Sequence, residues 1–410
     1  MDRLFELSTL DRQVGDERSR DDGFRSKPTL DWRVAGLFAG IGGIELGLQG
    51  VGMHTELLCE WWAPARAVLG HRFPDVPIAP DVRDLAELPP VDLVTAGFPC
   101  TDLSLAGSMK GIRGEASGLV GEVFRLLRDR RVPWVLLENV RNMLVLDGGR
   151  AMNVLVAELE ALGYQWAYRL VDSRFTGVPQ RRQRVILLAS TEGDPREVLF
   201  ADEAGEPDAG YFHDDMYGFY WTEGRRGLGW ARDAVPTLKG GSTIGIPSPP
   251  AIWNRSAQRG ERIVTPTLEA TERLQGFCAG WTERAGAEAG QKGARWKLVG
   301  NAVTVGVSEW VAGRLVSPVA FDTQAHRLSD SASWPTAAFG SGAMRWSVDS
   351  SMWPLRRTYT HLRDIVEGGA TPLSTRATSG FLDRATRSQI NFDARFLDDV
   401  AEHIADRKAA

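Results

Sequence analysis

The chain has 410 residues, 43% of them apolar and 25% charged, which is enough for a sizeable core and for two or three domains. No apolar run approaches the length of a membrane span, and the first residues do not form a signal peptide. Three cysteines and six histidines without ligand spacing predict neither a disulfide framework nor a metal site, and the net charge of −5 argues mildly against a polyanionic partner.

Residues 1–30 mix Arg and Asp with few apolar residues, so we expect a disordered tail there. From Trp32 onward, short apolar strands alternate with helical stretches. The expected strands are WRVAGLF, HTELLCE, PVDLVTAG, VPWVLLENV and QRRQRVILLAS. Segments such as IELGLQGVG and EVFRLLRDR between them have helical character. This alternation predicts an α/β domain over 31–190 with a doubly wound, mostly parallel sheet.

The alternation stops near Ser190, and the charge pattern changes there. Residues 191–215 are acidic, whereas 216–262 are basic and rich in Gly, Pro and aromatic residues. We interpret 191–264 as a small irregular domain with a basic face and with its acidic segment turned away. Residues 265–316 contain helical stretches, TPTLEATERLQGF and LVGNAVTVGVSEWVAGRLV, that we expect to return to the sheet. Residues 317–410 form a C-terminal extension to which the sequence assigns no role.

The first candidate site is GLFAGIGG, residues 36–43, a glycine-rich turn between the first strand and a helix. Such a turn lets backbone N–H groups approach a ligand, although tight turns require glycine in any case. Glu60 closes the second strand, where an acidic residue of dinucleotide-binding folds accepts hydrogen bonds from ribose hydroxyls. No P-loop lysine is present. We therefore expect a nucleoside ligand with little phosphate, and S-adenosylmethionine fits.

Three more candidates lie at strand ends. In GFPCTDLSLAG, Pro99 stops the strand ladder, so Cys100 is either an exposed nucleophile or a small buried hydrophobe. Glu138 ends the strand in LLENV and is suited to proton donation, or it caps a helix. Arg182 and Arg184 alternate along QRRQR, so they either converge on an anion or a carbonyl or lie on a solvated edge.

Together, GLFAGIGG, GFPC, ENV, QRRQR, RLQGF and GNAV, in this order across residues 33–316, resemble the cytosine-C5 DNA methyltransferase family of bacterial restriction–modification systems. The resemblance implies a Rossmann-like, S-adenosyl-L-methionine-dependent domain over 31–190, completed by 265–316, with target recognition in 191–264. It implies methyl transfer to C5 of a flipped-out cytosine in a specific double-stranded DNA sequence through a covalent cysteine adduct. It also implies a monomeric enzyme of the bacterial cytoplasm, bound to the nucleoid through DNA, without membrane or metal, and a cognate restriction endonuclease.

The resemblance assigns roles residue by residue. Cys100 is the implied nucleophile, Glu138 holds the N3–N4 edge of the base, and Arg184, supported by Arg182, contacts the base carbonyl. Residues 101–118 are the implied mobile lid. The implied cofactor-binding residues are Phe38, Ala39, Gly40, Ile41, Gly42, Gly43, Glu60, Trp61, Asp81, Val82, Pro99, Leu119, Asn301 and Ala302. The implied DNA-binding residues are Arg225, Arg226, Thr237, Leu238, Lys239, Arg255 and Arg259.

Two positions depart from the family pattern, and two alternative functions remain open. Gly36 stands where the family often has Asp, and Ala302 where a serine is common. One alternative is a tRNA cytosine-C5 methyltransferase of the same fold, whose usual Cys-Phe-Thr signature is absent. The other is a catalytically silent DNA-binding homologue, against which the intact Cys100, Glu138 and Arg184 argue. The DNA target sequence does not follow from the chain.

Overall fold

The structure, a computed structural model, describes residues 31–98, 118–223, 227–241, 249–288, 293–329, 332–342, 344–367 and 369–409. The predicted tail, 1–30, lies outside the described residues. Residues 31–410 belong to one unit. None of the helices in the described ranges has both the length and the apolar character that a membrane crossing requires.

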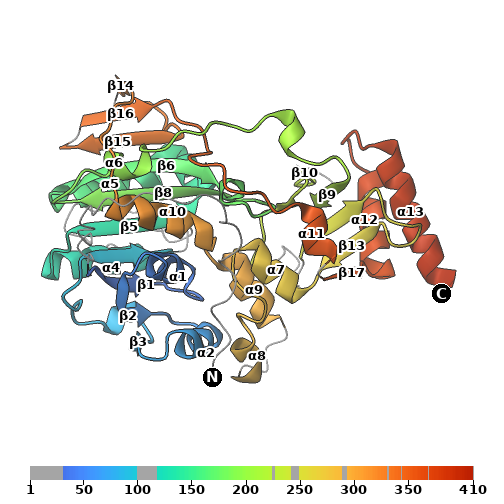
Figure 1. The fold of residues 1–410 in the computed structure, drawn as a ribbon, viewed down its shortest axis with the longest axis horizontal. Coiled ribbons are helices and arrows are strands. Elements are labelled where there is room, and N and C mark those ends of the chain that lie inside the picture. The colour runs from blue at the N-terminus through green and yellow to red at the C-terminus, as the bar shows by residue number, and fades with distance from the viewer. Residues whose placement is uncertain are drawn as a thin grey trace, which may run out of the picture. The chain divides into compact units, whose positions relative to one another are not determined.

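The predicted α/β alternation forms one half of a ten-stranded sheet, in which five neighbouring strands are parallel (Figure 1). Their spatial order is β5-β4-β1-β2-β3, so the chain winds first to one side of β1 and then to the other. The switch point between β1 and β4 is where such sheets bind ligands. The doubly wound α/β class is therefore confirmed. The strands are β1 (Arg33–Leu37), β2 (His54–Cys59), β3 (Ile78–Ala79), β4 (Leu93–Ala96) and β5 (Trp134–Val140).

The other half of the large sheet is antiparallel. Beyond β5 the order is β8-β6-β15-β16-β14. The strand predicted in QRRQRVILLAS is β8, and it runs antiparallel to both of its neighbours, β5 and β6. The connection from β6 to β8 is too short for the crossover helix that a parallel pair would need. Three of these strands come from the C-terminal extension. The bounds are β6 (Gln165–Asp172), β8 (Gln183–Ser190), β14 (Ala325–Arg327), β15 (Ala337–Ser341) and β16 (Met344–Val348).

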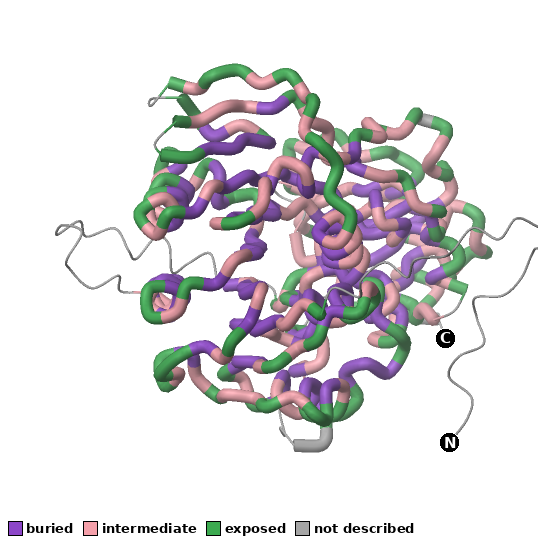
Figure 2. The backbone as a smooth tube through the Cα atoms, turned by 60° about the vertical axis from the view of Figure 1, so that its left-hand side comes forward, coloured by how far each residue is buried: buried purple, intermediate pink, exposed green. Residues whose placement is uncertain are grey.

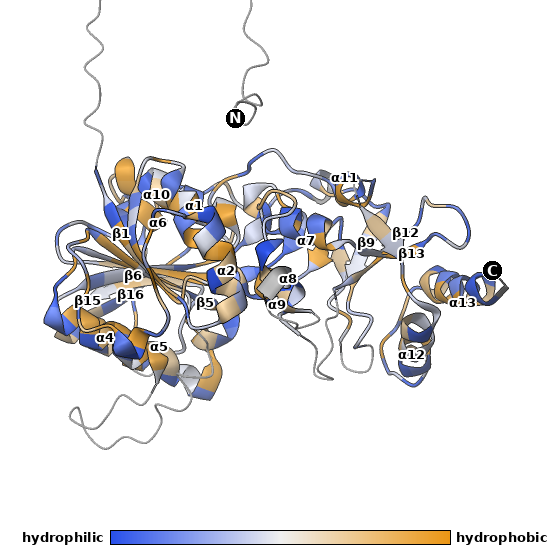
Figure 3. Cartoon of the chain, turned by 90° about the horizontal axis from the view of Figure 1, so that it is seen from below, coloured by the Kyte–Doolittle hydropathy of each residue, from blue (hydrophilic) through white to orange (hydrophobic). Residues whose placement is uncertain are grey.

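Helices cover both faces of the large sheet (Figure 3). On one face lie α4 (Leu119–Asp129) and α5 (Arg150–Ala161). On the other lie α1 (Gly43–Gln49), α6 (Arg196–Leu199) and α10 (Val305–Val316). Buried residues follow the inner strands and the helix faces turned toward them, and exposed residues follow the outer loops (Figure 2).

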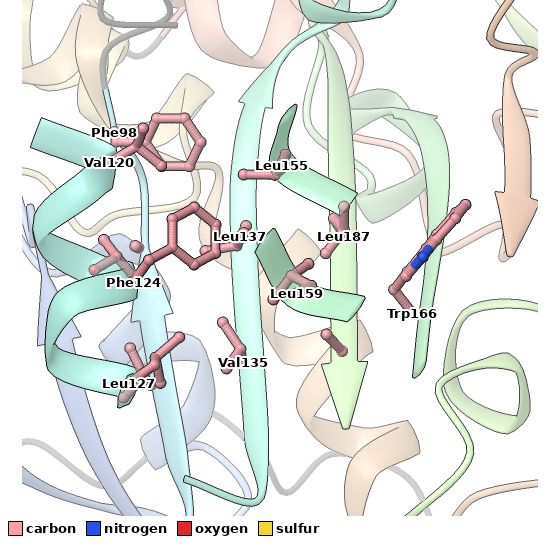
Figure 4. Packing of buried hydrophobic residues seen from close by; sticks show 14 of the residues in the cluster. Phe98, Val120, Phe124, Leu127, Val135, Leu137, Leu155, Leu159, Trp166 and Leu187 are labelled. Carbon is pink, nitrogen blue, oxygen red and sulfur yellow. The ribbon is translucent and has the colours of Figure 1, made fainter. Parts of the chain in front are cut away.

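Alternation along β5 separates the two cores. Val135 and Leu137 belong to the cluster under α4 and α5, whereas Leu136 belongs to the cluster on the opposite face. Figure 4 shows the first cluster, with Phe124 of α4 close to Leu137 and with α5 side chains over β8. Because successive side chains point to opposite faces and both faces are buried, these successive positions are all apolar, which explains the continuous apolar run in the sequence.

In its described part, the return segment contains α7 (Leu268–Leu274), α8 (Arg284–Glu288) and α9 (Ala294–Asn301) as well as α10. Helix α2 (Ala63–Arg72), from the first half of the chain, lies beside α8 and α9. The Thr267 hydroxyl caps α7 by accepting from the Ala270 N–H at 3.2 Å. The second predicted helix is broken into α9 and α10, because buried Gln275 takes over hydrogen bonding at the break. Its amide donates to the Val299 and Ala302 carbonyls, and its oxygen accepts from the Thr304 hydroxyl.

Residues 216–262, expected to be irregular, contribute most strands of a five-stranded antiparallel sheet. Its order is β10-β9-β12-β13-β17, with β9 (Met216–Phe219), β10 (Ala231–Arg232), β12 (Ala251–Asn254), β13 (Ile263–Pro266) and β17 (Ala370–Pro372). A separate parallel pair joins β7 (Gln180–Arg181) to β11 (Val235–Pro236). The C-terminal helices are α11 (Leu362–Glu367), α12 (Thr375–Thr386) and α13 (Ala394–Ala409).

Helices α12 and α13 lie beside the small sheet (Figure 1), and aromatic side chains attach them to it. Phe381 and Phe396 pack on Phe219, and Phe396 also contacts Trp253. The 317–410 segment therefore contributes strands to both sheets.

The expectation that the acidic segment 191–215 turns away from the basic one is wrong at its end. Asp214 pairs with Arg255 at 3.1 Å and also lies near Arg232, and Asp215 pairs with Arg363. The physical reason is that Asp214 and Asp215 directly precede β9, which lies inside the small sheet. The basic charges of this region are therefore partly neutralised within the protein.

We expect Asp399→Ala to lower the free energy of unfolding by about 1 to 3 kcal/mol, because it leaves the buried Trp253 indole N–H without an acceptor and removes one carboxylate partner of Arg262. The buried Asp399 carboxylate accepts from the Trp253 indole N–H at 2.8 Å and pairs with Arg262. Asp398→Ala, which changes the exposed neighbour, is the matched control. Urea denaturation followed by tryptophan fluorescence measures both variants, and equal midpoints would show that the buried contact adds no stability.

Candidate active site

The glycine-rich turn leads from β1 into α1 through backbone conformations that side chains rarely adopt. Phe38, Gly40 and Gly42 have φ values of 54°, 58° and 80°. A Cβ atom at Gly43 would come within 2.5 Å of the Val303 carbonyl oxygen, so the return segment lies directly against the turn. Trp281 donates its indole N–H to the Ile41 carbonyl at 2.9 Å. The turn is thus held from outside by residues far away in the sequence.

Glu60 ties this turn to the end of β2. Its Oε2 accepts from the Gly40 N–H at 2.9 Å, and its Oε1 accepts from the Trp62 N–H at 2.8 Å. Burial raises the pKa of Glu60, although both N–H donors act in the opposite direction. The adjacent Trp61 is 69% exposed. A buried carboxyl beside a bare aromatic ring suits a ribose and a purine.

Asp81 is the N-cap of a short 3₁₀ helix, η1 (Val82–Asp84), at the end of β3. It accepts from the backbone N–H of Arg83 at 2.9 Å and pairs with the Arg83 guanidinium. Hydrogen bonds from Arg83 lower the pKa of Asp81 to about 2. The carboxylate is therefore ionised at every physiological pH. Asp81 follows β3 as Glu60 follows neighbouring β2, so both lie at the carboxyl ends of the parallel strands.

Three predicted residues, Phe38, Val82 and Leu119, gather with Phe98 in one apolar cluster beside the turn. Val82 and Phe98 are buried members of the cluster, and Phe38 and Leu119 pack against it. Pro99, the next residue after Phe98, lies outside the described residues.

The other two predicted cofactor residues lie at the end of α9. Ala302 is buried, and its carbonyl accepts from Arg182. Asn301 is exposed, with its side-chain amide directly against the backbone at Gly240, so close that a Cβ atom at 240 would overlap it.

Glu138 and Arg184 form an ion pair at the boundary between the parallel and antiparallel halves of the sheet. Arg184 Nε lies 2.8 Å from Glu138 Oε1, and both side chains are about 11% exposed. Burial lowers the pKa of Arg184, and the Glu138 charge partly offsets that effect. The arrangement follows from strand register, since Arg184 lies opposite Val140, two residues beyond Glu138.

The same strand end holds the approach to Cys100. Asn139, next to Glu138, donates its side-chain amide to the Phe98 carbonyl at 3.0 Å. A Cβ atom at Gly97 would lie 3.6 Å from Glu138 Oε2, so the chain leaving β4 passes beside this carboxyl. Cys100 and residues 101–117 of the predicted lid lie outside the described residues. Sequence reasoning overlooked Asn139, although it belongs to the quoted ENV motif.

The two described cysteines differ in their exposure. Cys59 is buried at the end of β2, where desolvation raises the pKa of its thiol to about 12. Cys278 is exposed.

Arg182 has a different environment from Arg184. It is 1% exposed, and its guanidinium donates to the carbonyls of Leu238, Gly300 and Ala302 at 3.0, 3.2 and 2.7 Å. These contacts hold the backbone after β11 and at the end of α9, whereas Arg184 reaches Glu138.

Two glutamines extend this buried network, and both were overlooked although they lie in QRRQR and RLQGF. Gln180 donates to the Leu274 carbonyl and to the Gln275 side-chain oxygen, and it accepts from the Leu238 N–H. Their signal was their place inside quoted motifs: only Arg182 and Arg184 were given roles in QRRQR, and no residue was given one in RLQGF.

A polar groove of about 450 Å³ adjoins the Glu138–Arg184 pair. Arg141 donates to Gln183 Oε1 at 2.8 Å, and Arg181 donates to the Gly229 carbonyl at 3.2 Å. The groove is lined by Val140, Arg141, Asn142, Arg181, Gln183, Arg184 and Thr237. Three arginines at one groove suit an anionic ligand such as a nucleotide backbone.

The predicted DNA-binding residues are divided by the structure. Leu238 is buried, and the Thr237 hydroxyl donates to the Arg181 carbonyl at 2.9 Å. Lys239 pairs with Glu223 and lies over the Tyr220 ring. Arg255 pairs with Asp214, and Arg259 with Asp406 at 3.2 Å. Arg225 and Arg226 lie outside the described residues.

Among the residues that the structure describes, one group has side chains suited to a metal: His213, Asp233 and His361. The two imidazole rings stack at 3.5 Å with an angle of 4° between their planes. Asp233 already accepts from the backbone N–H groups of His213 and Leu362. In this arrangement the group joins the segments before β9, before β11 and before α11.

Comparison with known proteins matches residues 32–209 to the C-5 cytosine-specific DNA methylase family. The chain is 46% identical over 390 residues to the Type II methyltransferase M2.BsuMI of Bacillus subtilis, covering 92% of this chain and 99% of that protein. It is 36% identical over 169 residues to the Type II methyltransferase M.BanI of Aneurinibacillus aneurinilyticus, covering 40% and 39%. The crystal structure of S. pombe Dnmt2 methyltransferase shares the fold, with a TM-score of 0.52 at 16% identity, over 69% of this chain and 98% of that one. The chain therefore belongs to the C-5 cytosine-specific DNA methylase family, and it is a DNA (cytosine-5)-methyltransferase.

Proposed function

We propose that this methyltransferase takes its methyl group from S-adenosyl-L-methionine and transfers it to a flipped-out cytosine that is covalently attached to Cys100. The observation that carries the proposal is the buried Glu138–Arg184 pair beside the chain that leaves β4. Asn139 fixes Phe98, two residues before Cys100, to the strand end that bears Glu138. The carboxyl of Glu138, the guanidinium of Arg184 and the chain that leads to Cys100 thus share one end of the sheet.

The residues around the turn fit S-adenosyl-L-methionine. Glu60 is suited to the ribose hydroxyls, since its buried oxygens retain lone pairs beyond the two that backbone N–H groups use. Trp61 offers an exposed ring to the adenine, and Asp81 a fixed carboxylate to the adenine edge. Phe38 and Leu119 line the adjoining apolar cluster. When bound, the cofactor supplies an electrophilic methyl group.

On the base, the thiolate of Cys100 adds to C6, and the electron pair of the C5–C6 double bond becomes available at C5. Glu138 stabilises this adduct by holding the N3–N4 edge, and Arg184 contacts the base carbonyl while fixing Glu138 in place. C5 then bonds to the methyl carbon as the methyl–sulfur bond breaks. Loss of the C5 proton to water and departure of the thiolate from C6 restore the aromatic ring.

The substrate is duplex DNA, in which C5 and C6 are inaccessible until the cytosine is extruded. The groove beside Glu138–Arg184 suits the phosphates next to the extruded nucleotide, with Arg141 and Arg181 as the contacts. This assignment adds two arginines to the predicted DNA-binding set, in which Arg255 and Arg259 are already paired with carboxylates.

The relatives named Type II methyltransferases support a role in a restriction–modification system. Under this proposal the enzyme acts as a monomer in the cytoplasm, at the nucleoid, and protects sites that a cognate restriction endonuclease cleaves. No feature of the described site favours tRNA as substrate or a silent DNA-binding role.

Cys100→Ser is expected to lower methyl transfer to duplex DNA by about a thousandfold or more, because an alcohol cannot replace the thiolate at C6. Cys278→Ser, at an exposed cysteine, is the matched control and should keep wild-type activity. Transfer of tritiated methyl groups measures both variants. Activity of Cys100→Ser within tenfold of wild type would overturn the covalent mechanism.

Duplex DNA with 5-fluorocytosine at the target should trap a stable adduct on Cys100, since fluorine cannot leave as a proton does.

Arg141→Gln and Arg181→Gln should each weaken binding to all duplexes about equally. Each should also reduce the slope of log K against log salt by ~0.9 for every phosphate that the variant no longer neutralises. Arg259→Gln removes a similar charge that Asp406 and Glu402 already neutralise, so its slope should match wild type. Fluorescence anisotropy titrations over a salt series measure these slopes. A reduced slope for Arg259→Gln alone would place the phosphate contacts on the small sheet instead.

A further inference from the structure

A gap in the middle of the parallel strands is filled from an unexpected direction. Gly36 of β1 lies in register between Leu58 of β2 and Thr95 of β4. The missing side chain at position 36 leaves space between its two neighbours. The carboxyl of Glu45, from helix α1, occupies this space, so that a Cβ atom at Gly36 would overlap its Oε1.

Glu45 is buried with little polar compensation. It is 1% exposed, and its Oε1 accepts from the Thr95 hydroxyl at 2.9 Å. Its Oε2 is buried without a hydrogen-bond partner among the described residues. Desolvation raises the pKa of Glu45 to about 7. A buried acid of this kind costs stability, and replacing it with an apolar side chain would remove the cost.

The location of this carboxyl connects it with the chemistry. Each of the three registered residues lies two positions before a residue of the site: Gly36 before Phe38, Leu58 before Glu60, and Thr95 before Gly97. The Glu45–Thr95 bond joins the first turn of α1, which continues the glycine-rich turn, to the strand that leads toward Cys100. It therefore crosses the switch point between the cofactor half and the nucleophile half.

We propose that Glu45 is a positioning residue for methyl transfer, and that it supplies from α1 the carboxyl that fills the space left open at Gly36 of β1. The glycine and the glutamate are then one unit, in which a small residue at 36 is required because the acid comes from 45. This inference rests on the proposed function, since it assumes the cofactor at the turn and the nucleophile beyond β4. It adds that the carboxyl of Glu45 holds the spacing between the cofactor and the nucleophile.

The proposal predicts that position 36 of β1 can supply the carboxyl in place of Glu45. Position 36 faces the same space as the Thr95 hydroxyl, so an Asp there can accept the same hydrogen bond once Glu45 is shortened. The test compares Glu45→Ala, Gly36→Asp and the double variant Gly36→Asp/Glu45→Ala with wild type. Glu56→Ala, at an exposed glutamate on neighbouring β2, is the matched control.

Two measurements are made on the full-length enzyme with duplex DNA: the Kd for S-adenosyl-L-methionine by calorimetry, and kcat for methyl transfer. Glu45→Ala should weaken cofactor binding and lower kcat, together by about tenfold or more, and Gly36→Asp should be impaired further because two carboxyls then compete for one space. The double variant should recover to within about threefold of wild type. Single-variant effects that simply multiply in the double variant would overturn the proposal.

A purely structural role would give a different result: a lower melting temperature for Glu45→Ala with unchanged cofactor affinity and kcat. Two milder substitutions keep the test decisive even if the double variant does not fold. Glu45→Gln keeps an oxygen for Thr95 and should retain most activity, whereas Thr95→Val removes only the hydroxyl and should reproduce part of the Glu45→Ala effect. Wild-type kinetics in Thr95→Val would overturn the proposal. If Cys100→Ser stays active, the proposed function fails instead, whatever the Glu45 variants do.

The pH dependence of stability reports on the same carboxyl. Because Glu45 binds its proton more tightly in the folded than in the unfolded chain, wild type loses stability as pH rises from about 4.5 through about 7. Thr95 is the one polar side chain that its carboxyl contacts among the described residues. The melting temperature of wild type relative to Glu45→Gln should therefore fall between about pH 5 and about pH 8, and a constant difference would contradict the burial of an ionisable acid here.

Discussion

The buried guanidinium of Arg182 is the interaction on which the arrangement of the site depends. It donates to backbone carbonyls after β11 and at the end of α9. Burial, and after it the charge of Arg184, lower the pKa of this arginine. Gln180 and Gln275 complete the network. Backbone carbonyls are present whatever the side chains are, so the contact fixes the path of the chain and leaves neighbouring side chains free to diverge.

The Glu138–Arg184 pair depends on a second constraint, the change of strand direction at β5. A parallel neighbour would bring the carboxyl end of another strand to this edge, whereas antiparallel β8 brings the amino end. An arginine at the start of β8 therefore lies beside an acid near the end of β5. The departure from a fully parallel sheet is thus part of how the site is built.

The sequence predicted β1, β2, β4, β5 and β8, the glycine-rich turn, and the positions of Glu138 and Arg184 at strand ends, because apolar runs and the residues beside them are local signals. It could not assign β14 to β17 to their sheets, since short edge strands pair with partners far away in the chain. It could not show that Arg259 pairs with Asp406, 147 positions later. For Arg182, the alternation of residues indicated that its side chain lies on the same side of the strand as that of Arg184. It did not indicate which backbone carbonyls the guanidinium contacts. Glu45 escaped notice because its helix looked like an ordinary amphipathic one.

The C-terminal extension has a consequence for the order of synthesis. β15 pairs with β6 of the large sheet, and β17 pairs with β13 of the small one. During translation, Cys100, Glu138 and Arg184 are therefore synthesised well before β15 and β17, which the two sheets still lack at that stage. Nascent and prematurely terminated chains carry these three residues without β15 and β17, and all strands of both sheets are present only in chains translated past residue 372.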